Sequence, residues 1–145
     1  MFENILFPTD FSDVSRKALG FVKRLIEAGG KKVTLLHVID ESNLDTLSSI
    51  YTVPDYLKVE KDLHEKASKE MGFIENELKE IGYEVTTEIA KGIPLREILR
   101  VAAKEPSSII IIGSHGKSNI QEMLLGSVSE KVIRKAKIPV LVVKR

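Results

Sequence analysis

Residues 108–116, Ser108-Ile109-Ile110-Ile111-Ile112-Gly113-Ser114-His115-Gly116, place an uninterrupted apolar run directly before two spaced glycines. Gly126-Ser127 then complete the spacing Gly-x2-Gly-x9-Gly-Ser. Such an apolar run is typical of a strand covered on both faces, and glycine lets the backbone approach a ligand closely. A helix that begins at Gly126-Ser127 would add unpaired N–H groups and the positive end of its dipole. The stretch therefore predicts a strand, a turn and a helix arranged around an anion such as phosphate.

The rest of the chain alternates between apolar runs and helical spacing. Strands are predicted where the runs lie, at residues 4–8, 33–39, 83–90, 108–112 and 139–143. Helices are predicted where apolar residues recur every three or four positions, at residues 14–26, 63–81, 95–102 and 127–136. Ser12 is a candidate N-cap, Gly29-Gly30 stop the first helix, and Ser127 with Glu130 predicts a capping box. Residues 41–56 have no clear period and predict a mobile loop, and Gly92-Ile93-Pro94 predict a turn.

This alternation predicts a single α/β domain over residues 1–145, with a parallel sheet and helices on both faces. In such sheets ligands bind off the carboxyl ends of the strands, where the strand order reverses. The loops at those ends are residues 8–12, the segment after Asp40, residues 91–94 and residues 113–127. The glycine-rich stretch thus lies at the edge of the sheet where this fold class holds its ligands.

Composition limits the classes of partner. The 145 residues carry a net charge of +1, which gives no strong pull toward nucleic acid or membrane surfaces. The chain has no cysteine, which excludes disulfides and thiolate chemistry. Residues 1–6 lack the features of a signal peptide, and no apolar stretch is long enough to span a membrane. We therefore expect a cytoplasmic protein with no nucleic-acid or membrane partner.

The glycine spacing matches neither common nucleotide loop. No Gly-Lys-Ser/Thr follows a four-residue spacer, as a Walker loop requires, and the glycines follow the fourth predicted strand, unlike the Rossmann pattern. Gly113 and Gly116 can equally serve the geometry of a strand–helix junction. Gly126-Ser127 at the start of a helix favours the phosphate interpretation, although the Ser127 hydroxyl can also cap its own helix.

Asp10 is a second candidate, because it follows the first strand at the same edge of the sheet. Its carboxylate can bond ribose hydroxyls or hold a divalent cation beside phosphates, or it can simply form a turn. Thr9 has the same two interpretations. His37 is expected to be a core residue with satisfied hydrogen bonds, His64 to be solvated, and His115 to contact phosphate or shape the loop. The histidines show no metal-ligand spacing, and no Ser/His/Asp set is indicated.

The last predicted strand ends in Val140-Leu141-Val142-Val143, which contains no charge and no proline. At the edge of a sheet, such a strand leaves unpaired N–H and C=O groups with which a second copy can pair. We therefore expect either a homodimer through residues 140–143 or a loop or helix that covers this edge.

In these motifs the chain resembles the universal stress proteins, and within them the ATP-binding branch. The resemblance rests on residues 5–12, 36–38, 92–94, 112–116, 125–128 and 139–143, in order along essentially the whole chain. It implies a Rossmann-like, open five-stranded parallel sheet in the order 3-2-1-4-5, of the adenine nucleotide alpha hydrolase-like type. It also implies ATP as the ligand and dimers formed by antiparallel pairing of strand five.

The resemblance also assigns parts of the nucleotide to named residues. Asp10 and Val38 would lie by the adenosine and Gly113 by the ribose. The phosphates would lie by Gly116, Gly126, Ser127 and Val128, with Mg or Mn between them. The full implied set of nucleotide-binding residues is Pro8, Thr9, Asp10, Val38, Gly92, Ile112, Gly113, Ser114, His115, Gly116, Gly126, Ser127 and Val128.

Two classes of function follow from this resemblance. The first is a stress-response module in which bound ATP sets which protein partner, itself unidentified, the dimer engages. The second is a slow ATPase or phosphotransferase that a partner stimulates. The sequence favours the first, because no general base or arginine finger can be assigned beside the γ-phosphate, and we assign no catalytic residue. A structural dimer without nucleotide is disfavoured by the intact glycines.

Overall fold

The computed structural model describes residues 1–42, 44, 52–104, 106–114 and 127–145. In this part of the chain the strands are β1 (Asn4–Pro8), β2 (Lys32–Asp40), β3 (Glu84–Gly92), β4 (Ile109–Gly113) and β5 (Val140–Val143). The helices are α1 (Asp13–Arg24), the 3-10 helix η1 (Leu25–Ala28), α3 (Val53–Glu80), α4 (Pro94–Lys104) and α5 (Ser127–Lys135). Gly29 follows η1 with φ 98°, so the predicted stop of the first helix is confirmed.

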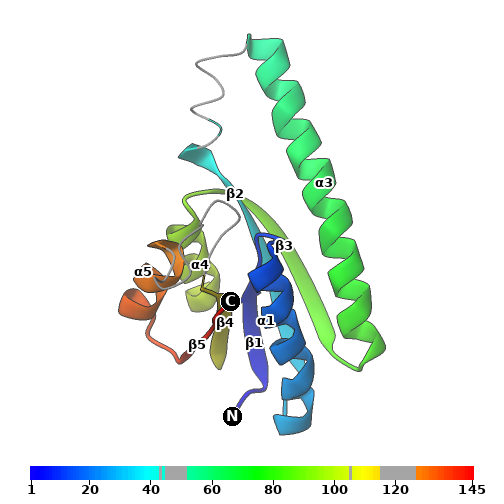
Figure 1. The fold of residues 1–145 in the computed structure, drawn as a ribbon, viewed down its shortest axis with the longest axis vertical. Coiled ribbons are helices and arrows are strands. Elements are labelled where there is room, and N and C mark those ends of the chain that lie inside the picture. The colour runs from blue at the N-terminus through cyan, green and yellow to red at the C-terminus, as the bar shows by residue number, and fades with distance from the viewer. Residues whose placement is uncertain (43, 45–51, 105, 115–126) are drawn as a thin grey trace.

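The strands form one parallel sheet in the order β3-β2-β1-β4-β5, as predicted (Figure 1). β1 pairs with β2 from Asn4↔Lys32 to Pro8↔Leu36, and with β4 on its other side at Ile5↔Ile109. The strand order therefore reverses between β1 and β4. The carboxyl ends of these two central strands mark the place where this fold class holds ligands.

Successive strand side chains alternate between two hydrophobic clusters, one on each face of the sheet. α1 and α3 cover the face that carries Phe7 and Leu35, and α4 and α5 cover the face that carries Leu6 and Leu36. All four side chains are fully buried, and burying a side chain of this size contributes about 1.5–3 kcal/mol. Coverage on both faces explains why the central strands read as nearly continuous apolar runs.

The loop predicted at residues 41–56 is wrong at residues 41, 42 and 44 and over residues 53–56, which are helical. Residues 43 and 45–51 lie outside the described part of the chain. Thr52 precedes α3 in an extended conformation, and its Oγ1 donates to Asp55 Oδ2 (2.8 Å). Pro54 lies in the first turn, where a missing N–H costs little. These signals for the start of α3 precede the first clear apolar period. Periodicity alone therefore placed the start at residue 63, later than the observed start at Val53.

Two further boundaries differ from the prediction. β2 extends to Asp40 and β3 to Gly92, because these two residues pair with each other at the end of the ladder. Gly92 thus ends a strand instead of lying in a turn. The predicted capping box is also wrong, since Ser127 is the first residue of α5 and not the residue before it. Glu130 instead accepts a hydrogen bond from Arg134 one turn later (2.9 Å).

Candidate functional site

Two described turns meet at the carboxyl ends of the central strands. Thr9 and Asp10 follow β1, while Gly113 ends β4 and Ser114 follows it. A Cβ on Gly113 would lie 3.2 Å from the backbone nitrogen of Ser15 in α1, so the end of β4 packs directly against the start of α1. The structure thus brings four predicted site residues together where the strand order reverses. Outside the described residues lie three others: His115, Gly116 and Gly126.

Thr9 holds the turn after β1 together. Its N–H donates to the Leu36 carbonyl (2.8 Å), and its Oγ1 accepts from the Phe11 N–H (3.1 Å). The same hydroxyl lies 2.5 Å from Ser15 Oγ, and the side chain is buried. Pro8, the last residue of β1, is buried too. Of the two interpretations that the sequence left open for Thr9, these contacts favour the turn former.

Asp10 is only half-buried, and one of its carboxylate oxygens is used by the turn. Oδ1 accepts from the Ser12 N–H (3.0 Å), which is the hydrogen bond of an Asx turn. Ser12 Oγ in turn accepts from the Ser15 N–H (3.2 Å), which confirms Ser12 as the N-cap of α1. No donor among the described residues bonds the other oxygen, Oδ2, which can accept from a ligand hydroxyl. Turn formation and ligand binding are therefore compatible roles for Asp10.

Sequence reasoning missed Phe11 as part of this turn. Phe11 has φ 65°, the only positive φ of a non-glycine residue among those described, and bulky side chains rarely adopt it. Its ring stacks on His37, with centroids 4.4 Å apart and planes at 27°. His37 Nδ1 lies 2.7 Å from the Thr9 carbonyl oxygen, which confirms the expected hydrogen bond, but the side chain is half-buried and not a core residue as predicted. No local signal in the sequence marks a left-handed phenylalanine, but a histidine inside an apolar strand did mark an unusual position.

The end of β4 is joined to β5 and to α5 by one hydrogen bond each. The Ser114 N–H donates to the Val143 carbonyl, and the Ser114 carbonyl accepts from Ser129 Oγ, both at 2.9 Å. Ser114 and Ser129 are buried, whereas Ser127 at the start of α5 is exposed. The first N–H groups of a helix have no partner within it. These bonds therefore hold the positive end of the α5 dipole beside the end of β4.

The apolar members of the predicted set belong mainly to the core. Ile112 is buried in the cluster under α4 and α5, and Val38 and Val128 are half-buried against it. A contact between these residues and a ligand would use backbone groups or the exposed part of the two valines.

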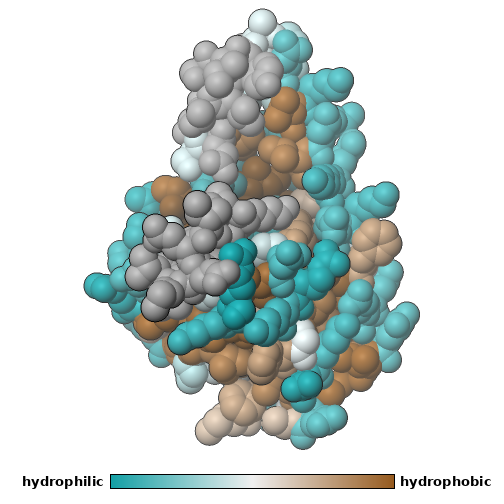
Figure 2. Space-filling model, in the orientation of Figure 1, coloured by the Kyte–Doolittle hydropathy of each residue, from teal (hydrophilic) through white to brown (hydrophobic). Residues whose placement is uncertain are grey.

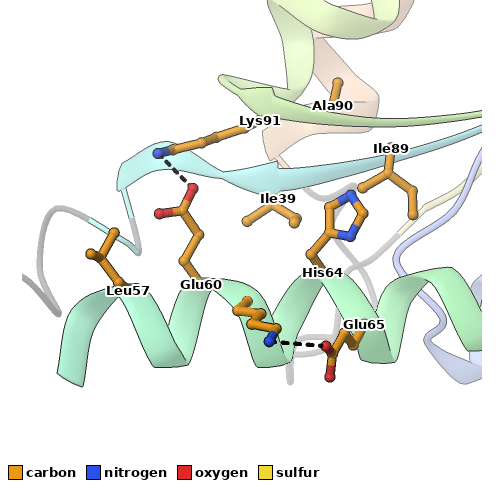
Figure 3. Close-up of a pocket in the computed structure, with 9 residues that line it drawn as sticks. Ile39, Leu57, Glu60, His64, Glu65, Ile89, Ala90 and Lys91 are labelled. Atoms are coloured by element: carbon orange, nitrogen blue, oxygen red, sulfur yellow. Dashed lines mark hydrogen bonds and ion pairs between the residues drawn. The ribbon is translucent and has the colours of Figure 1, made fainter. Parts of the chain in front are cut away.

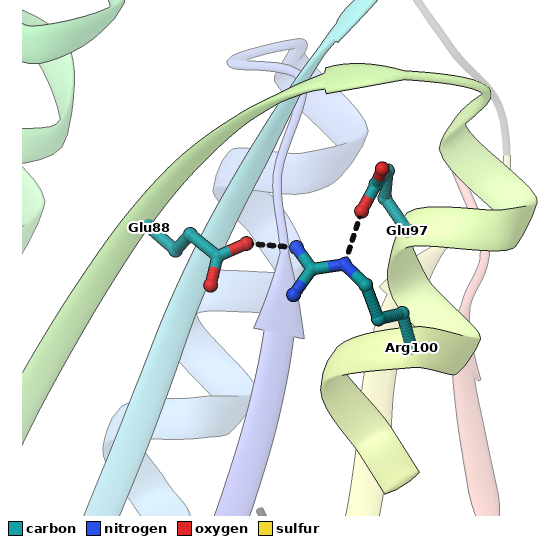
Figure 4. A network of polar contacts seen from close by, with 3 residues as sticks. All are labelled: Glu88, Glu97 and Arg100. Carbon is teal, nitrogen blue, oxygen red and sulfur yellow. Dashed lines mark hydrogen bonds and ion pairs between the residues drawn. The ribbon is translucent and has the colours of Figure 1, made fainter. Parts of the chain in front are cut away.

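Gly92 lies farther away, at the end of the edge strand β3. A Cβ there would lie 2.8 Å from Glu97 Oε1. Glu97 belongs to a surface network in which Arg100 pairs with both Glu97 and Glu88 (Figure 4). The hydrogen bonds that Arg100 donates to these carboxylates, the one to Glu97 first, raise the pKa of Arg100. The surroundings of Gly92 are thus those of a structural ion-pair network.

A cavity of about 540 Å³ lies elsewhere, between the first half of α3 and the ends of β2 and β3 (Figure 3). Ile39 and Ile89 line its sheet side. Across the cavity Glu60 pairs with Lys91 (2.9 Å), and this hydrogen bond raises the pKa of Lys91. His64 projects from α3 and is exposed, as predicted. None of the residues that line this cavity belongs to the set predicted to bind nucleotide.

The described residues contain neither a preformed metal site nor a membrane-spanning helix. No group of three His, Asp or Glu side chains there could hold a metal ion. No helix in this part of the chain is long and apolar enough to cross a membrane.

Residues 1–144 match the model of the universal stress protein family. The chain belongs to this family. Among its relatives, the universal stress protein MJ0577 of Methanocaldococcus jannaschii is 43% identical over 100% of this chain and 96% of that protein. A solved structure of MJ0577 has a TM-score of 0.88 to this chain and is covered over 97% of its length.

Other universal stress proteins support the same assignment. YxiE of Bacillus subtilis is 34% identical over 99% of this chain and 100% of that protein. A universal stress protein from Archaeoglobus fulgidus, solved in complex with dAMP, has a TM-score of 0.65 at 20% identity, over 99% of this chain and 98% of that one. At that identity the likeness shows a shared fold.

Proposed function

We propose that this universal stress protein binds ATP at the edge formed by the turns after β1 and β4. The observation that carries the proposal is the placement of Asp10. Its Oδ1 is fixed by the Ser12 N–H at the reversal of strand order, and its Oδ2 is left for a hydroxyl. A carboxylate at this edge of a doubly wound sheet can recognise ribose hydroxyls. The Gly-x2-Gly-x9-Gly-Ser spacing supports phosphates on the same ligand.

Each part of the nucleotide has proposed partners. Asp10 and the exposed part of Val38 would face the adenosine. Gly113 would contribute backbone groups to the ribose, since α1 fills the space that its side chain would take. The phosphates would be held by backbone N–H groups of Gly116 and Gly126 and by the first turn of α5. The dAMP complex of the Archaeoglobus fulgidus protein supports an adenine nucleotide as a ligand that this fold can hold.

Mg or Mn fits the oxygen atoms that this edge offers. The Ser127 hydroxyl is a hard oxygen donor of the kind that both ions prefer. Phosphate oxygens and water would complete the coordination. A metal bound there would neutralise phosphate charge.

Calorimetric titration with ATP tests the site. Gly116→Val and Gly126→Val should abolish binding, because a side chain would occupy the space of the phosphates. Gly20→Val is a matched control, since a Cβ on Gly20 meets no atom within 4 Å. If both loop variants bind ATP as the wild type does, the phosphates are held elsewhere.

We further propose that bound ATP acts as a signal and is hydrolysed only slowly. No general base could be assigned from the sequence, and Asp10 is committed to a turn on the proposed nucleoside side. Turnover by the isolated protein should stay far below about 1 per second, the lower range of ordinary enzymes. Turnover at or above that rate would favour the ATPase or phosphotransferase alternative.

We propose that β5 is the dimer contact. β5 and β3 are the two edge strands of the sheet. β3 carries Glu84, Glu88 and Lys91, charges that discourage pairing with another chain. β5 is entirely apolar, and Leu141 is 36% exposed. Antiparallel pairing of two β5 strands would be self-complementary, as a two-fold interface requires.

Leu141→Lys tests this contact most cleanly, because the neighbouring Val142 packs against the core. Sedimentation should show a dimer for the wild type and a monomer for Leu141→Lys, with circular dichroism confirming the fold. Thr87→Lys places the same charge on an exposed position of β3 and should remain dimeric. A folded Leu141→Lys variant that stays dimeric would mean that the subunits meet through another face.

A further inference from the structure

The turn after β1 contains a backbone conformation that needs support from its surroundings. Phe11 adopts φ 65°, in the left-handed region that disfavours residues with a side chain. Such conformations persist only where the neighbouring structure enforces them, and they gather at ligand-binding sites. Phe11 directly follows Asp10. If Phe11 relaxed to a negative φ, the peptide between the two residues would rotate and redirect the Asp10 carboxylate.

Three described contacts hold Phe11 in this conformation. Its N–H donates to Thr9 Oγ1 (3.1 Å), and its ring stacks on His37 at 4.4 Å. The ring is also half-buried against the hydrophobic cluster under α1 and α3. The stack with His37 joins β2 to a residue that lies beyond the end of β1.

Besides the stack with Phe11, His37 makes a hydrogen bond to the same turn. The β1–β2 ladder ends at the pair Pro8↔Leu36, and His37 is the next residue of β2. Its Nδ1 lies 2.7 Å from the Thr9 carbonyl oxygen. A carbonyl only accepts, so Nδ1 must carry the proton and donate. The His37 side chain thereby continues the attachment of the turn to β2 where backbone pairing stops.

Asp10 consequently lies between two residues that His37 contacts. His37 bonds the Thr9 carbonyl on one side of Asp10 and stacks on the Phe11 ring on the other. We propose that His37 and Phe11 are positioning residues that aim the Asp10 carboxylate at the ribose of the bound nucleotide. Neither residue needs to touch the nucleotide. The inference rests on the proposed function, and it assigns to His37 a role that exposure and sequence position did not indicate.

A double-mutant cycle with Asp10→Asn tests this role by calorimetric titration with ATP and Mg. His37→Phe keeps an aromatic ring for the stack and removes the donor to Thr9. If His37 acts through Asp10, His37→Phe should weaken ATP binding about tenfold in the wild-type background. In the Asp10→Asn background the same change should cost less than about twofold, because the group that it aims is already gone. A merely structural role predicts equal losses in both backgrounds.

Phe11 supplies an independent second cycle. Phe11→Tyr keeps the stack and should bind ATP within about twofold of the wild type, whereas Phe11→Leu should bind about fivefold more weakly, an effect that Asp10→Asn again removes. This cycle decides the question if circular dichroism shows that His37→Phe does not fold. Equal losses in both backgrounds overturn the positioning role alone. A wild-type protein that binds no ATP overturns the proposed function, and this inference with it.

Discussion

The cavity beside α3 and the edge of the sheet at the carboxyl ends of β1 and β4 differ in whether their charged side chains form ion pairs. In the cavity Glu60 pairs with Lys91 and Lys61 with Glu65, so the charges cancel in pairs. At the edge, Asp10 accepts one hydrogen bond from an uncharged N–H, and no cation of the described residues pairs with it. The cavity is a well-defined hollow, but the turns after β1 and β4 carry the charge that a ligand can use.

The cavity itself follows from a change along the inner face of α3. Ala67, Met71 and Leu78 are buried against the sheet. Nearer the start of the helix, the polar side chains of Glu60 and His64 take the positions that face Ile39 and Ile89 across the hollow (Figure 3). In Figure 2 a hydrophobic area lies beside the upper half of α3. The hollow is thus accounted for by incomplete packing, which requires no ligand.

The largest effect on binding is expected at Asp10. Asp10→Asn keeps an oxygen for the Ser12 N–H and removes the charge that a ribose hydroxyl would meet. A hydrogen bond to a charged group is worth about 1.5–3 kcal/mol, so ATP affinity should fall by about ten- to a hundredfold. Asp13→Asn, in the exposed first turn of α1, is the matched control and should bind ATP normally. Equal affinities of Asp10→Asn and the wild type would contradict the account of the edge.

Replacing the two glycines that end β4 and β3 should lower the stability of the protein by different amounts. A Cβ on Gly113 would lie 3.0 Å from Val14 Cγ1 and 3.2 Å from the Ser15 backbone nitrogen, which cannot move aside easily. Gly113→Ala should therefore lower the free energy of unfolding by about 1–3 kcal/mol. Gly92→Ala would meet only side-chain atoms of Glu97, which can shift more easily than backbone, and should cost less than Gly113→Ala, about 1 kcal/mol or less. Urea unfolding measures both, and equal costs would refute close packing of β4 on α1.

Tyr83 follows the end of α3 and is buried. Its hydroxyl donates a hydrogen bond to the Val22 carbonyl (2.6 Å). Tyr83→Phe should cost about 1 kcal/mol of stability and leave ATP binding unchanged. Burial raises the pKa of Tyr83 from 10.0 to about 12. Because the unfolded chain releases this proton first, the contribution of Tyr83 is complete below pH 10 and is lost as the pH rises toward 12.

The pH dependence of Tyr83 is measured as a difference between two proteins. The gap in unfolding free energy between the wild type and Tyr83→Phe should narrow from pH 10 to pH 12, with a slope of at most about 1.4 kcal/mol per pH unit. A constant gap would show that the Tyr83 hydroxyl is not held in the buried environment described.

The smallest effect is expected in the cavity. Glu60→Gln breaks the pair with Lys91, whose side chain is 45% exposed, so the loss of stability should stay below about 1 kcal/mol. ATP affinity should be unchanged. A tenfold loss of affinity in this variant would reverse the comparison and make the cavity the nucleotide site.

The fold was largely predictable because its determinants are local. The alternation of apolar runs with helical spacing indicated a parallel sheet with helices on both faces, and the family resemblance supplied the strand order. The start of α3 was missed because Thr52 and Pro54 mark it in a segment without apolar period.

The candidate site was predictable only where a residue's place along the chain already put it at the carboxyl end of a strand. Asp10 directly follows the first apolar run, so its position at the carboxyl end of β1 could be predicted. The hydrogen bond from the Ser12 N–H shows that it also forms a turn. The roles of Phe11 and His37 depend on a stack between residues 26 positions apart and on a left-handed φ, which spacing cannot express. Ser129 was missed for the same reason, because its partner Ser114 lies on a different element.

The central claim is the location of the nucleotide, and amide chemical shifts during titration with ATP and Mg test it most directly. The account predicts that the largest shifts fall on Thr9, Asp10, Ser114 and the first turn of α5, while Ile39, Glu60 and Ile89 change little. Largest shifts on the cavity residues, with the turns after β1 and β4 unmoved, would contradict it.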